Sequence, residues 1–190
     1  MRLYDLYETS DLTFQGSNSA DLIESKKWLC NILKELDLDI AEFSTIYILG
    51  SWYGNMAVVL KDSNIPFEKI INVDTDKEVL DKSDDLLRDI GIKNLESMNK
   101  DANDLDYRQV TSDSLIINTS TQDIEGKRWW DRIPKGVLVA LQGRDSAKKS
   151  YKNLEEFDKT FPLSRTLYLD KKQLEDQDTD YYRFMKIGIK

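Results

Sequence analysis

The sequence places a short glycine-bounded segment, Gly50-Ser51-Trp52-Tyr53-Gly54, between two apolar runs. A turn from a strand into a helix needs glycine where φ is positive or where a ligand approaches the backbone closely. The helix that follows such a turn presents free backbone N–H groups, which favour negatively charged ligands. The segment therefore predicts a cofactor-binding turn between a strand and a helix. The alternative is a tight turn without a ligand.

Polar residues follow the next apolar runs in a regular order. Asp74 and Thr75 end the second run, twenty residues beyond Gly54, and Asp101 and Ala102 end the third. A carboxylate at that distance from a glycine turn typically accepts hydrogen bonds from the hydroxyls of a ribose. An acidic residue after the next strand can bond an adenine amino group. Their joint order predicts a nucleoside site, although each residue alone could be a helix or turn cap.

Uncharged polar residues follow the fourth apolar run, in the segment Asn118-Thr119-Ser120-Thr121-Gln122. In an open parallel sheet, ligands bind beyond the carboxyl ends of the strands. The segment therefore falls where a substrate would meet a cofactor held by the three preceding sites. Its alternative role is to cap the next helix through side-chain oxygens.

The elements that must position these residues can be predicted from apolar periodicity. We expect helices over 19–37, 55–64, 76–91 and 153–161, and strands over 44–49, 69–74, 95–101, 114–120, 136–142, 164–170 and 181–189. This alternation predicts an α/β fold with a doubly wound, mostly parallel seven-stranded sheet and helices on both faces. The polar run 171–180 shows no clear helix, so the last two strands are expected to form an antiparallel hairpin.

Composition limits the classes of function. The chain has 190 residues, a length typical of a single domain. We divide this domain into an N-terminal arm and helix, 1–43, and a sheet core, 44–190. There is no histidine and only one cysteine, Cys30, which excludes histidine-dependent nucleophiles and the usual zinc sites; we expect no metal site. Cys30 is expected to be a buried apolar residue in a soluble, cytoplasmic protein.

The net charge of −8 favours a small molecule or a protein over nucleic acid as partner, because an acidic surface repels phosphate backbones. Two basic groups, Lys127-Arg128 with Arg132 and Lys148-Lys149 with Lys152, could still form a local basic rim. No apolar stretch has membrane length, so no membrane partner is expected. The oligomeric state is left open.

These motifs together resemble the class I, Rossmann-like, S-adenosylmethionine-dependent methyltransferases, and the likeness runs from residue 19 to the C-terminus. In that family a Gly-x-Gly-x-Gly turn lies under the methionine part of the cofactor, an acidic residue holds the ribose, and the pair after the third strand meets the adenine. The resemblance implies S-adenosylmethionine as cofactor. The implied cofactor-binding residues are Gly50, Ser51, Trp52, Tyr53, Gly54, Asp74, Thr75, Asp101, Ala102 and Asn118.

The resemblance also implies roles in catalysis. Methyl transfer from a sulfonium needs no acid to activate the leaving group, so positioning can supply much of the rate. We expect Asn118, Ser120 or Gln122 to orient the acceptor, and Asp123 to serve as a base where the acceptor must lose a proton. The acceptor itself is not identified.

Other aromatic and N-terminal residues have less specific signals. Trp129 and Trp130 are expected to form an aromatic wall over the acceptor or else to pack in the core. Phe14 and Gln15 are expected to belong to a lid over the cofactor, or to a surface arm.

Three departures from the family pattern bear on function. Trp52 stands where the family has its middle glycine, and Ile48 replaces a frequent acidic residue. No Asp-Pro-Pro-Tyr type motif follows the fourth strand, which argues against enzymes that methylate amino groups of adenine or cytosine. The alternatives are a non-catalytic cofactor- or nucleoside-binding protein on the same fold, an NAD-dependent enzyme, and an interaction module without a ligand. The absence of a Gly-x-Gly-x-x-Gly spacing lowers the NAD alternative.

Overall fold

The computed structural model describes residues 19–36, 38, 42–145, 150–176 and 179–190. The proposed lid residues Phe14 and Gln15 lie outside the described residues. So do Lys148 and Lys149 of the second basic group.

Within the described residues, seven strands form one sheet with the order β3-β2-β1-β4-β5-β7-β6. The first five strands in the chain are parallel, and β7 runs antiparallel to both β5 and β6. The predicted α/β fold with a mostly parallel sheet and an antiparallel C-terminal strand is confirmed. The strands are β1 (Phe43–Leu49), β2 (Phe67–Asp74), β3 (Leu95–Asn99), β4 (Ser114–Asn118), β5 (Leu138–Arg144), β6 (Arg165–Asp176) and β7 (Thr179–Ile189).

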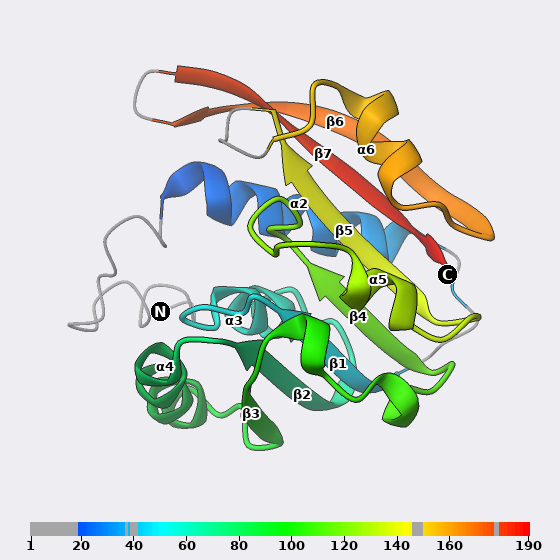
Figure 1. Ribbon diagram of the computed structural model, residues 1–190. Coiled ribbons are helices and arrows are strands. Elements are labelled where there is room, and N and C mark those ends of the chain that lie inside the picture. The colour runs from blue at the N-terminus through cyan, green and yellow to red at the C-terminus, as the bar shows by residue number, and fades with distance from the viewer. Residues whose placement is uncertain (1–18, 37, 39–41, 146–149, 177–178) are drawn as a thin grey trace.

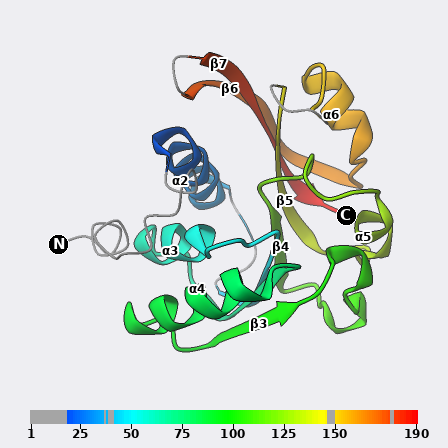
Figure 2. The same ribbon diagram turned by 60° about the vertical axis from the view of Figure 1, so that its left-hand side comes forward.

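Helices cover both faces of the sheet, as Figures 1 and 2 show. The helices are α2 (Ala20–Glu35), α3 (Asn55–Asp62), α4 (Lys77–Asp89), α5 (Arg128–Arg132) and α6 (Leu154–Thr160), with short 3-10 turns η1 (Ala102–Asp104) and η2 (Tyr107–Gln109). Side chains of α2, α3 and α4 pack on one face of the sheet, whereas side chains of η1, η2, α5 and α6 pack on the other. The two layers arise because successive residues of a buried strand point to opposite faces.

Strand β1 illustrates this division of the core. Ile46 and Ile48 face the layer that contains α3, and Tyr47 and Leu49 face the layer that contains α5. Each of these four side chains is at most 5% exposed. A run of apolar residues without polar alternation is therefore what a central strand of this sheet requires.

The C-terminal hairpin is longer than expected. The polar run 171–180 was predicted as a connection, but residues up to Asp176 continue β6 and pair in register with β7, for example Lys172 with Arg183. Backbone pairing at a sheet edge needs no apolar side chains, so a polar run can continue the ladder. The third and fourth strands instead end earlier than predicted, at Asn99 and Asn118.

Among the described residues, no helix is long and apolar enough to cross a membrane.

Candidate cofactor site

The glycine turn connects β1 to α3 with left-handed backbone at both ends. Gly50 has a φ of 66° and Gly54 a φ of 75°. A Cβ on Gly50 would meet nothing within 4 Å, so its backbone conformation and not crowding calls for glycine there. At Gly54 a Cβ would lie 2.6 Å from Leu87 Cδ1, which shows how closely α4 approaches the turn. The turn is held against β2 because the N–H groups of Gly50 and Ser51 donate to the Val73 carbonyl.

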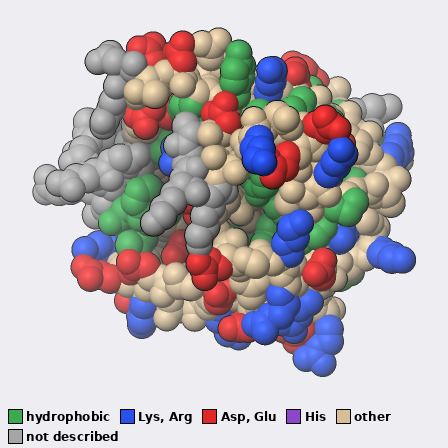
Figure 3. Space-filling model, turned by 45° about the horizontal axis from the view of Figure 1, so that its top comes forward, with side chains coloured by type: hydrophobic (Ala, Val, Ile, Leu, Met, Phe, Trp, Pro, Cys, Tyr) green, Lys and Arg blue, Asp and Glu red, His purple; other side chains and the backbone are tan. Residues whose placement is uncertain are grey.

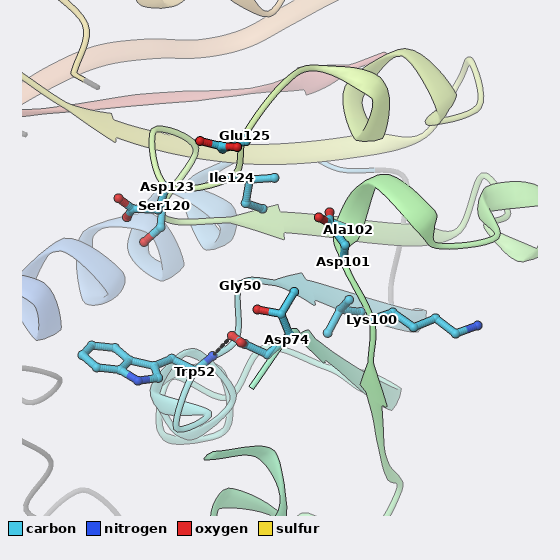
Figure 4. A pocket seen from close by; sticks show the side chains of 12 residues that line it. Gly50, Trp52, Asp74, Lys100, Asp101, Ala102, Ser120, Asp123, Ile124 and Glu125 are labelled. Carbon is cyan, nitrogen blue, oxygen red and sulfur yellow. Dashed lines mark hydrogen bonds between the residues drawn. The ribbon is translucent and has the colours of Figure 1, made fainter. Parts of the chain in front are cut away.

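Trp52 adopts the conformation that glycine would adopt more easily. Its φ is 47°, in the left-handed region, and its side chain is 43% exposed. The indole packs against Tyr53 with ring centroids 5.3 Å apart. Figure 4 shows the indole pointing away from Asp101 and Ala102, so it does not fill the space between them and Asp74. The tryptophan therefore leaves this part of the site open.

We expect Trp52→Gly to raise the free energy of unfolding by roughly 1 kcal/mol, because left-handed backbone costs a residue with a Cβ about that much. Denaturant titration measures the change. The matched control is Asn64→Gly, at the other described non-glycine residue with positive φ, 54°. Asparagine tolerates this region, so the control should gain less. A loss of stability in Trp52→Gly would mean that the indole's contacts outweigh the backbone strain.

Asp74 ends β2 with both carboxylate oxygens engaged by backbone. Its Oδ2 accepts a hydrogen bond from Trp52 N–H at 2.8 Å (Figure 4), and its Oδ1 accepts one from Asp76 N–H at 3.0 Å. A carboxylate has about four lone-pair sites, so two oxygens held this way can still accept from ligand hydroxyls. The turn and the carboxylate thus fix each other's position. Thr75, the next residue, lines the same cavity.

Asp101 and Ala102 lie across the cavity from Asp74. Asp101 Oδ1 accepts hydrogen bonds from the backbone and side-chain nitrogens of Asn103, at 2.7 and 2.9 Å, so it does cap the turn η1. Both Asp101 and the buried Ala102 nevertheless line the cavity. The capping role and a ligand-facing position are therefore compatible.

A cavity of about 390 Å³ brings most of the predicted residues together (Figure 4). Gly50, Trp52, Asp74, Thr75, Asp101, Ala102, Ser120 and Asp123 line it. A second cavity of about 330 Å³ shares Gly50, Trp52, Ser120 and Asp123 with the first and adds Ser51 and Tyr53. The two cavities therefore adjoin at the glycine turn and the loop after β4. Gly54 is not among the described residues that line either of them and serves the turn instead.

The loop after β4 divides into residues that face the cavities and one that supports them. Ser120 and Asp123 line both cavities, and Gln122 Nε2 donates to Asp123 Oδ2 at 2.8 Å. Asn118 is fully buried, and its Oδ1 accepts from Ser120 N–H at 2.9 Å. It is absent from the described residues that line the cavities, so its observed contact holds the loop that carries Ser120.

The predicted aromatic wall is wrong. Trp129 and Trp130 are 1% and 2% exposed and pack against Phe161, with ring centroids 5.6 and 5.3 Å apart. They belong to the core layer beneath the sheet, which was the alternative explanation. The short helix α5 is apolar on the side that carries both indoles because that side faces this layer.

Cys30 is buried as predicted, and burial raises the pKa of its thiol to about 12. A thiol with that pKa is protonated at neutral pH and is a poor nucleophile. Within the described part of the chain, no cluster of three or more Cys, Asp or Glu side chains could hold a metal ion.

Sequence reasoning missed several lining residues. Ile124 and Lys100 line the first cavity, and Lys26, Arg144 and Arg183 line the second. Arg183 carried a usable signal, because a charged residue inside the apolar run 181–189 must find a polar environment. Lys26 carried none, since a lysine in an amphipathic helix ordinarily faces solvent.

Comparison with known proteins supplies structural likeness only. No protein-family model matches the chain, and no curated protein matches it either. An rRNA methylase from Streptococcus thermophilus has a similar structure, with a TM-score of 0.57 and 18% identity over 91% of this chain and 99% of that chain. A SAM-dependent methyltransferase from Aquifex aeolicus has a TM-score of 0.58 and 16% identity, over 84% and 88%.

A third similar structure is the M. capricolum TrmK protein in complex with S-adenosyl-homocysteine, its natural cofactor product. Its TM-score is 0.57 and its identity 12%, over 83% of this chain and 66% of that chain. Strand order, the antiparallel β7 and these likenesses agree. The chain has the fold of the class I, Rossmann-like, S-adenosylmethionine-dependent methyltransferases.

Proposed function

We propose that this protein is an S-adenosylmethionine-dependent methyltransferase. The observation that carries the proposal is the Asp74 carboxylate, which lines the first cavity at the carboxyl end of β2 while Trp52 N–H fixes its orientation. In an open α/β sheet this edge is where ligands bind, and an acid here suits ribose hydroxyls. The fold makes this class of ligand the first to consider, but fold alone does not determine function.

The residues present fit an adenosyl cofactor. Open space above Gly50 leaves room for a ligand against the backbone of the turn. Asp74 would accept from the ribose hydroxyls, and Asp101 from the adenine amino group, with Ala102 and Ile124 as apolar contacts for the ring. Ser51 and Tyr53 would lie beside the methionine part. When bound, S-adenosylmethionine supplies a methyl group on a positively charged sulfur, which is already activated for transfer.

The protein's own task is then to hold the acceptor in line and to manage its proton. Ser120 would orient the acceptor by a hydrogen bond, because it lines both cavities where they meet. Asp123 lies beside it and would take up the acceptor's proton where one must leave. Asn118, through its hydrogen bond to Ser120 N–H, would position this loop without touching the acceptor.

The acceptor class follows less directly. The face in Figure 3 carries both acidic and basic side chains, and neither kind forms a continuous patch over that face. With a net charge of −8, this favours a small molecule or a protein as acceptor over nucleic acid. We place the reaction in the cytoplasm, because a chain with a single cysteine cannot form an internal disulfide and therefore suits a reducing compartment.

Isothermal titration calorimetry of the full chain with S-adenosylhomocysteine, S-adenosylmethionine and NAD tests the proposal. We expect micromolar or tighter binding of both sulfur nucleotides and none of NAD, because the site offers a single ribose carboxylate beside a short glycine turn. Heat-denatured protein serves as the blank. The proposal is overturned when neither S-adenosylmethionine nor S-adenosylhomocysteine binds.

A non-catalytic cofactor-binding protein is the second candidate. It is favoured by Trp52 in the glycine turn and by Asn118, which does not reach the cavities. The two candidates differ in turnover: incubation with methyl-labelled cofactor and pooled acceptors, followed by mass spectrometry, yields a labelled product only from an enzyme.

A further inference from the structure

The second cavity is lined by parts of the chain that are far apart in the sequence. It lies between the first half of α2, the glycine turn, the loop after β4, the carboxyl ends of β5 and β6, and the first half of β7. Figure 1 shows the N-terminal end of α2 on the side of the sheet toward which β4 points. This cavity therefore adjoins the first one at the glycine turn, where the methionine part of the proposed cofactor would lie, and extends away from the adenine side of that site.

Two cationic side chains are buried in its wall. Arg183 is 1% exposed and Lys26 9%. Arg183 Nε donates to the Ser25 hydroxyl at 3.1 Å, and its Nη2 donates to the Thr119 carbonyl. Lys26 Nζ makes a long hydrogen bond, 3.4 Å, to the Leu22 carbonyl of its own helix. Both charges are thus held by neutral groups.

A third cation, Arg144, lines the same cavity from the end of β5, 5.9 Å from the Tyr181 ring centroid. In the described part of the chain, none of the three cations lies within ion-pair distance of a carboxylate. Three acids line the cavity too, namely Asp21, Asp123 and Asp176. Asp21 is buried and accepts a hydrogen bond from the Tyr181 hydroxyl at 2.6 Å, whereas Asp123 is exposed and Asp176 is half-buried. Only Asp21 shares the interior with the cations.

Another buried lysine in the same protein shows what a purely structural charge looks like here. Lys186, 2% exposed, pairs with Asp158 Oδ1 at 2.5 Å and also donates to the carbonyls of Asp158 and Phe161. Burying a charge without a partner costs several kcal/mol, so buried charges are normally paired in this way. Among the described residues, the cations of the second cavity have no such carboxylate partner.

Unpartnered polar atoms in the same wall also indicate a ligand. Ser51 Oγ, Arg144 Nε and Gln122 Oε1 are buried and find no hydrogen-bond partner among the residues that the structure describes. Ser51 and Gln122 are 6% and 5% exposed, and all three residues line the cavity. The first two atoms can donate to an anion, whereas the amide oxygen can accept from a hydroxyl or amine on the same molecule.

We propose that the second cavity binds an oxyanion, a carboxylate or phosphate, of the methyl acceptor, which makes the acceptor an acidic small molecule. This assignment of the acceptor rests on the proposed methyltransferase function of the adjoining cavity. The amino-acid end of the cofactor carries one carboxylate and one ammonium, so it adds no net negative charge to offset the cations. An acidic acceptor supplies that charge, with Lys26 and Arg183 as its main partners.

The ionisation of Lys26 agrees with this role. Burial, together with the nearby Arg183 guanidinium, lowers the pKa of Lys26 to about 7. An anion bound between the two side chains would favour the charged ammonium and raise that pKa again.

The test uses inorganic phosphate and succinate as probes, titrated into the full chain by calorimetry at constant ionic strength and without nucleoside. Succinamide, the neutral analogue of succinate, is the control ligand. We expect saturable binding of at least one anion and none of succinamide. Lys26→Met, which keeps the length of the side chain, should weaken that binding about tenfold, the scale for losing a hydrogen bond to a charged group. Arg183→Met is the second variant, and Lys61→Met, a lysine outside both cavities, is the matched control.

Each outcome decides the proposal. No saturable binding of either anion, or equal binding by folded Lys26→Met, overturns it. Thermal melting verifies that each variant is folded. Lys26 has the smaller structural role, because in the described part of the chain its ammonium makes one long hydrogen bond, to Leu22, whereas the Arg183 guanidinium makes two.

The cofactor provides the last comparison. S-adenosylhomocysteine and 5′-methylthioadenosine differ in the amino-acid end. If Lys26→Met weakens the first and spares the second, the cations bind the cofactor's carboxylate and the acceptor assignment is overturned. If the anions bind but neither nucleoside does, the oxyanion site stands and the methyltransferase function fails.

Discussion

Asp74→Ala should weaken S-adenosylhomocysteine binding by about 1 to 3 kcal/mol, which is roughly 5- to 150-fold in Kd, the range for losing hydrogen bonds to a charged group. The carboxylate is already oriented before any ligand arrives, because Trp52 N–H and Asp76 N–H hold its two oxygens at 2.8 and 3.0 Å. A ligand therefore pays little to order it. Calorimetry on folded protein measures the change.

The matched control is Asp76→Ala, two residues further on. Asp76 caps α4, since its Oδ1 accepts from Val79 N–H at 3.1 Å, and it is not among the described residues that line the first cavity. Losing this cap should cost about 1 kcal/mol of stability and leave cofactor affinity unchanged. Equal affinities of Asp74→Ala and the unmodified protein would refute the ribose assignment.

A second comparison separates the two jobs of Asp74. Its carboxylate both faces the cavity and anchors the turn through Trp52 N–H. Asp74→Asn keeps one acceptor oxygen for that N–H, so we expect it to retain more stability than Asp74→Ala. Its affinity for the cofactor should still fall, because an amide offers one acceptor oxygen where the carboxylate offers two.

The first cavity could be predicted from the sequence because parallel strands end at one edge. Once β1, β2 and β3 are identified as neighbours in one sheet, residues that follow them must meet, whatever the details of the loops. Asp74 and Asp101 needed only the correct strand ends. Both residues therefore line the first cavity, and Figure 4 shows them apart from each other at the ends of neighbouring strands.

The second cavity could not be predicted in this way. Its cations come from α2 and β7, and the Ser25–Arg183 hydrogen bond joins residues 158 positions apart. No local periodicity encodes such a contact, because it depends on how α2 packs over the antiparallel hairpin. The apolar pattern of 181–189 predicts a buried strand but gives no indication of which buried group will meet Arg183.

The tryptophans illustrate a different limit. The sequence allowed Trp129 and Trp130 to lie either over a substrate or in the core, because a short helix with two adjacent indoles can turn them toward one or the other. Adjacent residues on a helix point about 100° apart. In the structure, Phe161 packs on both indoles, and Phe157 of α6 packs on Phe161 in turn, so residues some thirty positions later in the chain help to bury both tryptophans.

Trp129→Ala should lower the free energy of unfolding by about 3 to 5 kcal/mol, the cost of removing a large aromatic side chain from a packed core. Trp129 is 1% exposed and touches both Trp130 and Phe161, so no neighbour can fill the space without moving another ring. Denaturant titration measures the loss. Because small domains have only about 5 to 15 kcal/mol of stability, the measurement belongs at low temperature.

Trp52→Ala is the control for indole loss, since its ring is 43% exposed and packs mainly on Tyr53. It should cost less than about 1 kcal/mol, as surface substitutions usually do. Folded Trp129→Ala should bind S-adenosylhomocysteine as the unmodified protein does, because Trp129 contributes to the core and not to the described cavity walls. A variant with unchanged stability and weakened binding would instead restore the aromatic wall and require α5 to face the acceptor.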